Sequence, residues 1–362
     1  MEVDLTGGLD PAHEYLHTEY QTAKGLQEGM NWWLWDDAGQ FCMPRFAVEC
    51  TTPDWDHPEI QLGFARADGK LLLRNLSKAP VHKKLDAAGN ASHLGAGPLW
   101  FDCIEPFRRY SVEFQGNAIA GTFEEMLAPA FTSDERGVYA MAAGRDSPPL
   151  SIAALQFAIE AKAVVPPWVQ GSMSDDAHER MKAGAEAEFV GGQRLEQLMR
   201  VKGTINYNGT TQEFTGGALR IRRTGIRNIT GFWGHCWQSA VFPSGRAFGY
   251  IAFPPRADNS SSYNEGYVFL GEGSLIPARV VEAPWLRHYQ FSGEDVGFVM
   301  ETLDGRRFAI KGTSFGGVPS VAAAGSAMPS LFQSVAHYEW DNEKAYGMME
   351  RSNLPENITG PT

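Results

Sequence analysis

The sequence predicts an all-β protein built from barrels or sandwiches, with one short helix near its N-terminus. Three observations carry this prediction. Short runs of alternating apolar and polar residues recur through most of the 362-residue chain, as expected for strands with one buried face. Tight turns containing glycine separate many of these runs, which is typical of hairpins. Aromatic residues make up 12% of the chain, which suits large β interiors.

The N-terminal helix is expected over residues 10–24. Asp10 can cap its first turn, Pro11 suits the first helical position, and no helix breaker follows before Gly25. From residue 30 onward the pattern is β. Hairpin turns are expected at 36–39, 67–70, 208–209, 244–245, 304–305 and 341–342.

Residues 170–188 interrupt the β pattern. Ser174, Asp175 and Asp176 precede a run rich in Ala and Glu, which predicts a short helix. Strands resume at Arg194. We therefore expect two β domains, residues 1–188 and 189–362.

Composition narrows the classes of partner. A net charge of −12 argues against nucleic acid or an anionic membrane surface, because both attract basic patches. The N-terminus has neither the basic start nor the apolar segment of a signal peptide, and no segment suits a membrane span. Four scattered cysteines fit neither a disulfide scaffold nor a zinc site. A cytoplasmic protein without a bound metal is therefore expected.

The segment 231–269 is the chemically densest part of the chain. If its two halves are strands, Trp233, His235 and Trp237 share one face of the first, because side chains alternate along a strand. The same rule aligns Tyr263, Glu265 and Tyr267 on the second. Together they predict an apolar pocket with few proton-transfer groups, as in sites for hydrophobic ligands.

Each candidate also has a structural interpretation. His235 titrates near neutral pH and could transfer a proton, or it could be a hydrogen-bonded core histidine. Glu265 is a general acid with a raised pKa if it is buried, and a solvated charge if its strand lies at an edge. Trp233 and Trp237 either pack in the core or stabilise a cationic intermediate. Tyr250 has the same ambiguity as Tyr263.

Arginines gather just before this segment, at positions 220, 222, 223 and 227. They could bind an anionic group of a ligand, with Arg227 as the candidate substrate-binding residue, or form a solvated basic strand edge. Glu196 could be a buried acid or an ion-pair partner. No phosphate-loop pattern occurs, and the Gly-x-Ser-x-Gly string at 312–316 lacks the strand–loop–helix context of a nucleophile elbow. This disfavours nucleotide-dependent and ordinary hydrolase chemistry and predicts no cofactor.

Several blocks resemble the two-domain, lipocalin-like proteins grouped with carotenoid 1,2-hydratase (hydroxyneurosporene synthase), kievitone hydratase and fungal Diels–Alderases. The resembling blocks are the aromatic strand and Asp-Gly-Lys hairpin of 30–73, the segment 97–116, Arg194-Leu195-Glu196-Gln197 with the following Val201-Lys202-Gly203-Thr204, and 338–350. The resemblance implies two lipocalin-like β-barrel or β-sandwich domains packed together.

The resemblance also bears on activity. A His-x-Trp pair and a downstream Tyr-x-acid pair are implicated in the hydratases, and His235-Cys236-Trp237 and Tyr263-Asn264-Glu265 are similar in type and order. Many relatives carry Arg-Asp-His-Ser-Trp-Gly-Pro-Arg where this chain has residues 220–227, so the Asp, His and Trp of that motif are absent here.

These observations predict a cofactor-independent lyase or cyclase, such as a hydratase or dehydratase of secondary metabolism. Its substrate would be a hydrophobic terpenoid, steroid, polyketide or aromatic molecule. Glu265 would exchange the proton, His235 and Tyr263 would orient water or substrate, and the substrate would contact Trp233, Trp237, Tyr250, Tyr267 and Arg227. The alternative is a carrier protein that binds a hydrophobic ligand without chemistry.

Overall fold

The first ten strands of the chain form one antiparallel sheet that closes into a barrel. The computed structural model describes residues 3–15, 23–82, 85–127, 151–183, 185–256, 258, 260–322 and 328–359. Eight strands form the ring, in the order β10-β1-β2-β3-β4-β6-β7-β9, and pairing of β9 with β10 closes it. The strands of this sheet are β1 (Leu26–Asp36), β2 (Phe41–Thr51), β3 (Asp54–Arg66), β4 (Lys70–Lys78), β5 (Leu99–Glu105), β6 (Arg109–Thr122), β7 (Ser151–Ala163), β8 (Trp168–Val169), β9 (Gln193–Tyr207) and β10 (Thr210–Ile226).

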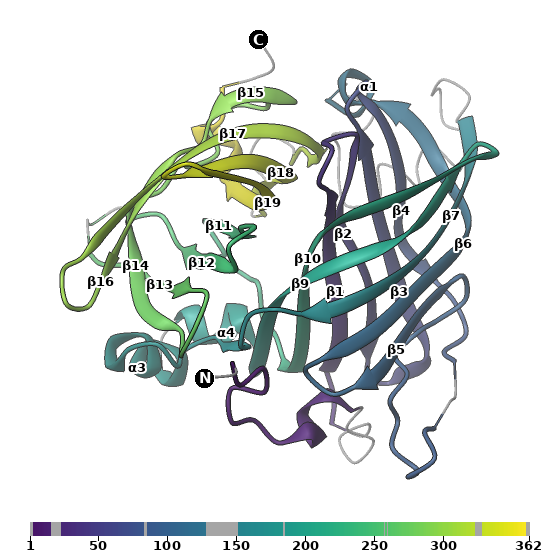
Figure 1. Cartoon of the computed structure of the whole chain (residues 1–362), viewed down its shortest axis with the longest axis horizontal. Helices are drawn as coiled ribbons and strands as arrows, with labels where there is room; N and C mark the ends of the chain where they lie inside the picture. Colours follow the sequence, from purple (N-terminus) through teal and green to yellow (C-terminus); the bar gives the residue numbers. More distant parts are fainter. Residues whose placement is uncertain are drawn as a thin grey trace.

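The last nine strands form a second antiparallel sheet, on the left of Figure 1. Pairing of β17 with β18 closes an eight-strand ring here as well, and β15 flanks β17. The all-β prediction with two barrel-like units is thereby confirmed. The strands are β11 (Gly234–Val241), β12 (Arg246–Ala252), β13 (Asn264–Leu270), β14 (Ile276–Glu282), β15 (Ser292–Asp295), β16 (Phe298–Thr302), β17 (Arg307–Ser320), β18 (Ser330–Trp340) and β19 (Glu343–Asn353).

Short helices flank the sheets. Among residues 3–15, Pro11–Glu14 is helical, as the 3₁₀ turn η1, capped by the Asp10 carboxylate, which accepts a hydrogen bond of 2.8 Å from the N–H of Ala12. Tyr15 is extended, so the helix expected over 10–24 is not continuous through this residue, and residues 16–22 lie outside the described part. The helical segment expected near 174–188 is present as α3 (Asp175–Ala183) and α4 (Ala185–Val190). The remaining helices are α1 (Phe123–Leu127) and η4 (Pro355–Asn357). None of the described helices is long and apolar enough to cross a bilayer.

The first sheet continues beyond the expected boundary at 188/189. β9 and β10 follow that boundary in sequence but complete the first barrel, pairing with β7 and β1. Asn208 and Gly209 join them with φ angles of 49° and 82°, the left-handed pair that a type I′ hairpin turn requires. The chain passes from one sheet to the other between Ile226 and Gly234. The division into domains at 188/189 stays a prediction.

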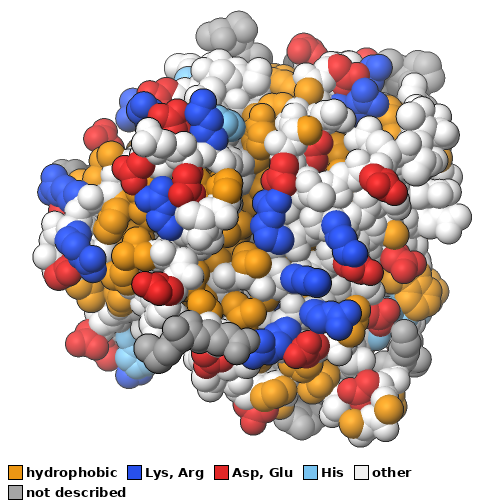
Figure 2. Space-filling view, in the orientation of Figure 1, with side chains coloured by type: hydrophobic (Ala, Val, Ile, Leu, Met, Phe, Trp, Pro, Cys, Tyr) orange, Lys and Arg blue, Asp and Glu red, His pale blue; other side chains and the backbone are white. Residues whose placement is uncertain are grey.

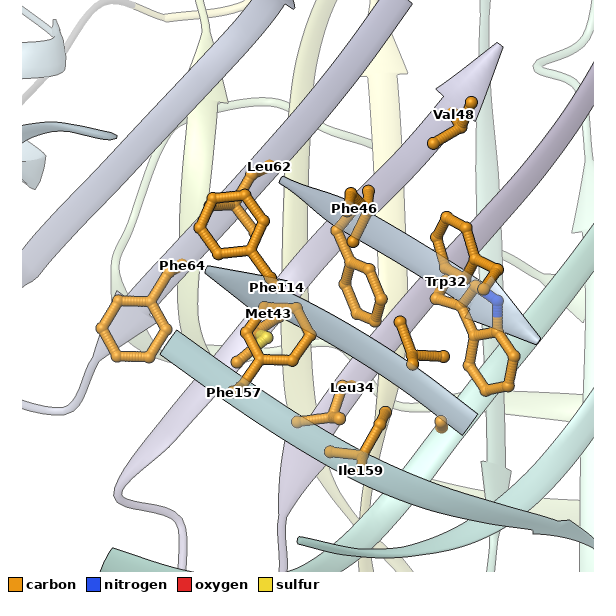
Figure 3. Packing of buried hydrophobic residues seen from close by; sticks show 14 of the residues in the cluster. Trp32, Leu34, Met43, Phe46, Val48, Leu62, Phe64, Phe114, Phe157 and Ile159 are labelled. Atoms are coloured by element: carbon orange, nitrogen blue, oxygen red, sulfur yellow. The ribbon is translucent and has the colours of Figure 1, made fainter. Parts of the chain in front are cut away.

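The interior of the first barrel is packed with apolar side chains (Figure 3). β7 shows why: its residues alternate strictly between exposed and buried, with Leu155, Phe157 and Ile159 pointing inward. Trp32 and Phe46 stack in parallel near the centre, with ring centroids 6.4 Å apart. On the outer face visible in Figure 2, cationic and anionic side chains are interspersed.

The two barrels meet along a seam, which we define as the buried cluster containing Trp33, Trp35, Trp168, Trp237 and Tyr267. β1 and β10 of the first barrel pack there against β11 and β19 of the second. Trp33 and Trp237 meet edge to face across the seam, with ring centroids 4.9 Å apart. Every residue of β11 is buried, because one of its faces lines the second barrel and the other lines the seam.

Candidate functional site

Strand alternation brings most of the expected site residues to the seam. On β11, Trp237 packs in the seam cluster, whereas Cys236 belongs to the interior cluster of the second barrel. His235 lies on the same side as Trp237, and Trp233, just before the strand, packs against the same cluster. The predicted common face of these three side chains is therefore present.

The second predicted group lies on the same surface. Tyr263 and Tyr267 belong to the seam cluster, and Glu265 pairs in register with Ile251, another seam residue. Tyr267 packs edge to face on Trp168 of the first sheet, at a centroid distance of 5.7 Å. Tyr250 is the exception among the expected residues. It points into the second barrel, where its hydroxyl lies 3.3 Å from the Cys236 sulfur.

A cavity of about 50 Å³ lies within the seam. Its walls combine aromatic rings with charged side chains from both sheets. The aromatic residues are Trp33, Phe189, Phe232, Trp237 and Phe253. The ionisable residues are Arg45, Arg194, Arg223, Arg227, His235 and Glu350. Of the expected site residues, His235, Trp237 and Arg227 line this cavity.

His235 forms a buried pair with Glu350. Its Nε2 lies 2.8 Å from a Glu350 oxygen, and its Nδ1 lies 2.7 Å from the Ser352 hydroxyl. Burial alone would raise the pKa of Glu350, but the hydrogen bond and charge of His235 outweigh it and hold this pKa at about 2. Gln333 donates a further bond of 2.7 Å to the other carboxylate oxygen. Glu350 is thus ionised at neutral pH, and its carboxylate lies within hydrogen-bond distance of the imidazole Nε2.

Glu265 has a different environment. Its two carboxylate oxygens accept hydrogen bonds of 2.7 Å from the N–H groups of Gly171 and Met173, and the Tyr263 hydroxyl donates another. Burial raises the pKa of Glu265, and these hydrogen bonds oppose the rise only in part. The residue is buried, as its candidate role as an acid required, but it holds the loop between β8 and α3 and does not line the 50 Å³ cavity.

The sequence matches the family model of DUF7064, a domain of unknown function, over residues 10–355. The chain belongs to the DUF7064 family. No curated protein matches its sequence significantly.

Solved structures resemble this DUF7064 protein over nearly its whole length. An AttH-type protein (NE1406) from Nitrosomonas europaea has 14% identity and a TM-score of 0.53, covering 95% of this chain and 96% of that one. CghA has 10% identity and a TM-score of 0.49, covering 91% and 88%. Kievitone hydratase from Nectria haematococca has 9% identity and a TM-score of 0.47, covering 94% and 93%. The neighbours thus include the hydratase named in the sequence resemblance, and the match to NE1406 confirms the fold.

The arginine cluster of the DUF7064 protein divides between two sites. Arg220 and Arg222 are buried and form ion pairs with Glu14 (2.7 Å) and Glu28 (2.5 Å). Arg223, one position on, lines the seam cavity instead. The expectation of a solvated basic edge is therefore wrong, because β10 is covered on both faces.

Arg194 and Glu196 support the cavity wall. The Arg194 guanidinium lies over the Trp237 ring, 4.2 Å from its centroid, and its terminal nitrogen is 2.9 Å from a Glu196 oxygen. The other Glu196 oxygen accepts a 3.0 Å bond from the Trp237 indole N–H. Burial raises the pKa of Glu196, against the opposing charge of Arg194. Of the two readings of Glu196 from sequence, the ion-pair partner is observed.

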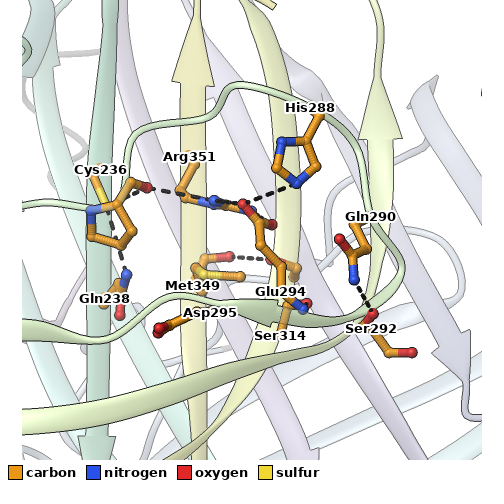
Figure 4. A network of polar contacts seen from close by, with 12 residues as sticks. Cys236, Gln238, His288, Gln290, Ser292, Glu294, Asp295, Ser314, Met349 and Arg351 are labelled. Atoms are coloured by element: carbon orange, nitrogen blue, oxygen red, sulfur yellow. Dashed lines mark hydrogen bonds and ion pairs between the residues drawn. The ribbon is translucent and has the colours of Figure 1, made fainter. Parts of the chain in front are cut away.

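The interior of the second barrel holds a separate polar network (Figure 4). Arg351 makes a two-pronged ion pair with Glu294, with distances of 2.8 and 2.5 Å, and His288 lies 3.6 Å from the same carboxylate. Gln238 accepts a 2.8 Å bond from the Tyr338 hydroxyl nearby. The charges of Arg351 and Glu294 pair with each other in this network, whereas the seam cavity is lined by charged groups from both sheets.

Sequence reasoning missed Glu350 and Ser352. Both lie on β19, which pairs with β11 so that Glu350 stands opposite Trp237 and Ser352 opposite His235. In the sequence, the segment 338–350 is identified only by its resemblance to the hydratase-related proteins. A carboxylate on a strand that can pair with β11 is the sequence signal that points to Glu350.

Proposed function

We propose that this protein is a lyase or cyclase that acts by proton transfer at the seam cavity, without a cofactor. The reaction would add or remove water at a C=C bond, or close a ring, on a hydrophobic molecule of terpenoid, steroid, polyketide or aromatic type. The observation that carries the proposal is the His235–Glu350 pair on the wall of a cavity lined by aromatic rings and arginines. The resemblance of His235-Cys236-Trp237 to the His-x-Trp pair of hydratases supports the same class of chemistry.

In this proposal His235 and Glu350 act together. A ligand atom that approaches the pair can take the shared proton or return it, because either partner can hold it when their mutual contact is replaced. The Ser352 hydroxyl holds His235 at two points. It accepts a 2.9 Å hydrogen bond from the backbone N–H of His235 and lies 2.7 Å from the ring Nδ1. Trp237 would exclude water beside the reacting centre. Trp233 and Tyr267 would pack around it.

Glu265 and Tyr263 are assigned a positioning role. Their short contact and the two backbone bonds to Gly171 and Met173 connect β13 to the loop before α3. That loop follows β8, whose Trp168 packs on Tyr267. Loss of the Glu265 carboxylate would then shift the seam wall without removing the proton donor.

The test is turnover of a compound panel by purified variants. Terpenoid, steroid, polyketide and aromatic alkenes are incubated with the protein, and products are identified by mass spectrometry as hydrated, dehydrated or isomerised species. His235→Ala and Glu350→Gln should lose roughly 10²- to 10⁴-fold in kcat, the usual contribution of general acid–base catalysis. His57→Ala is the matched control, because its side chain is 56% exposed and does not line the seam cavity.

Two outcomes would contradict the proposal. Full activity in both seam variants would remove His235 and Glu350 from the reaction. Tight binding of a panel compound that is always recovered unchanged would instead identify a carrier protein.

A further inference from the structure

One arginine of the seam cavity has no direct hydrogen bond or ion pair among the described residues. Arg223 is only 9% exposed, yet its guanidinium makes no hydrogen bond or ion pair with any described residue, and its Nε is fully buried. It lines the cavity. An isolated buried charge is costly, so proteins normally pair such groups or leave them for a ligand.

The neighbouring cations are already paired, with one exception. Arg45 contacts Glu49 at 2.8 Å, Arg194 contacts Glu196 at 2.9 Å, and His235 contacts Glu350. Arg45, Arg194 and His235 therefore each contact a carboxylate directly.

Arg227 is the exception. Its only bond recorded among the described residues is from Nε to the carbonyl oxygen of Phe189, at 2.5 Å. Burial lowers the pKa of Arg227 to about 10, and the charges of Arg194 and Arg45 add to this effect. Glu49 faces both Arg223 and Arg227, and burial alone would raise its pKa, but these cations and Arg45 lower it. Glu49 thus faces three guanidinium groups, and Glu350 also acts on Arg227, but the guanidinium groups of the cavity wall outnumber these carboxylates.

We propose that the seam cavity binds the carboxylate of its ligand, with Arg223 as the principal anchor and Arg227 beside it. The inference rests on the proposed function for the ligand's apolar part and adds that the substrate is a hydrophobic acid. A planar carboxylate matches the forked donors of a guanidinium. The free volume of about 50 Å³ exceeds the roughly 10–15 Å³ that one water molecule needs, so an acid head group fits.

The remainder of such a ligand would lie against the aromatic wall. Phe232 and Phe253 line the cavity with ring centroids 5.5 Å apart, and Phe232 is partly exposed. An unsaturated chain or ring that extends from the carboxylate toward Phe232 would pass beside His235, whose ring centroid is 5.4 Å from that of Phe232. In this arrangement Arg223 would bind the carboxylate of the ligand, and the His235–Glu350 pair would contact its apolar part.

The test compares acids with their neutral amides of the same shape. Acetate and acetamide, benzoate and benzamide, and cinnamate and cinnamamide are titrated into the full-length protein at pH 7.5 and low salt by calorimetry. We expect at least one acid to bind roughly 10- to 100-fold more tightly than its amide, because only the acid forms a charge-assisted pair. Arg223→Met should abolish this preference, and Arg223→Lys should retain part of it. Arg306→Met, an exposed control, should leave it unchanged.

Thermal unfolding of the same variants separates binding from structure. Because Arg223 forms no direct hydrogen bond or ion pair with a described residue, Arg223→Met should unfold at the same or a higher temperature than the wild type. The proposal is overturned if no acid is preferred over its amide, if Arg223→Met keeps the preference, or if this variant is destabilised. Acid binding without turnover would uphold the anchor and reject the proposed reaction. Turnover of neutral compounds without a preference for acids would uphold the proposed reaction and reject the Arg223 anchor.

Discussion

The interior of the first barrel and the seam between the barrels are built from the same strands but differ in chemistry. β1 contributes Trp32 to the barrel interior and Trp33 to the seam. The interior side meets Phe46, Phe101 and other apolar rings. The seam side meets Trp237, behind which lie Arg194 and Glu196.

The difference shows where function can reside in this fold. A closely packed apolar interior stabilises the barrel but offers a ligand no directed interaction. The seam is assembled from two sheets, so groups from distant parts of the chain, such as Arg45, Arg223 and Glu350, converge there around free volume. We therefore expect mutations in the barrel interior to change stability and mutations in the seam to change chemistry.

The largest effect is expected from a mutation in the interior of the first barrel, which should change stability but not ligand binding. Phe46→Ala removes a fully buried ring from the barrel interior and should lower the free energy of unfolding by about 3–5 kcal/mol, through lost contacts and a residual cavity. Urea denaturation measures this change. Ile152→Ala, at a side chain that is 72% exposed on β7, is the control and should cost little. Ligand binding by the folded fraction should be unaffected; a loss of binding equal to that of seam variants would argue against the separation.

A second effect concerns acid stability. The folded-state pKa of Glu350, about 2, lies below its ordinary value of 4.5, so its ionised form stabilises the fold above pH 4.5. This contribution should be lost as the pH falls from about 4.5 to about 2, and it corresponds to roughly 3 kcal/mol. Denaturant unfolding between pH 6 and 2.5 should show a smaller loss for Glu350→Gln than for the wild type. Equal slopes would mean that His235 does not hold this carboxylate.

Much of this arrangement follows from local pattern. Alternation along a strand predicted the common face of Trp233, His235 and Trp237, because the period of two applies wherever a strand forms. The same rule applied to β10 would have separated Arg223 from Arg220 and Arg222, which the sequence analysis treated as one cluster. That signal was available in the spacing.

Other features depend on pairing between distant strands. Glu350 is 115 residues from His235 and becomes its neighbour only through the register of β11 and β19. Similarly, β9 and β10 complete the first barrel although a helical segment precedes them, because strand pairing and not proximity in sequence decides which sheet a strand joins. Tyr250 was expected in the pocket, but its parity on β12 points it into the second barrel.

A third prediction sharpens the contrast between two buried carboxylates of the seam. Glu265→Gln replaces one accepting oxygen with an NH₂ group that would face a backbone N–H, so we expect a loss of about 1–3 kcal/mol. Because the pKa of Glu265 is raised, its ionisation in the fold is unfavourable. The wild type's advantage over the variant should therefore be largest below pH 4.5 and shrink as the pH rises, opposite to Glu350.

Hydrogen exchange locates this effect. The amides of Gly171 and Met173 should exchange faster in Glu265→Gln than in the wild type, because their acceptor is weakened. Turnover should fall less than in His235→Ala. A loss as large as that of His235→Ala, with unchanged exchange at these two amides, would make Glu265 the proton donor.

The smallest expected effect tests how His235 is oriented. Ser352→Ala removes the hydroxyl that contacts the ring Nδ1 of His235 and accepts a hydrogen bond from its backbone N–H. This loss should cost about 1 kcal/mol of stability. Because the contact with Glu350 remains, the imidazole should stay in the cavity wall but lose its fixed ring position, so kcat should fall more than KM changes. Ser352→Thr, which keeps a hydroxyl, should recover part of kcat. If the alanine variant changes stability alone, Ser352 supports the seam without aligning the histidine.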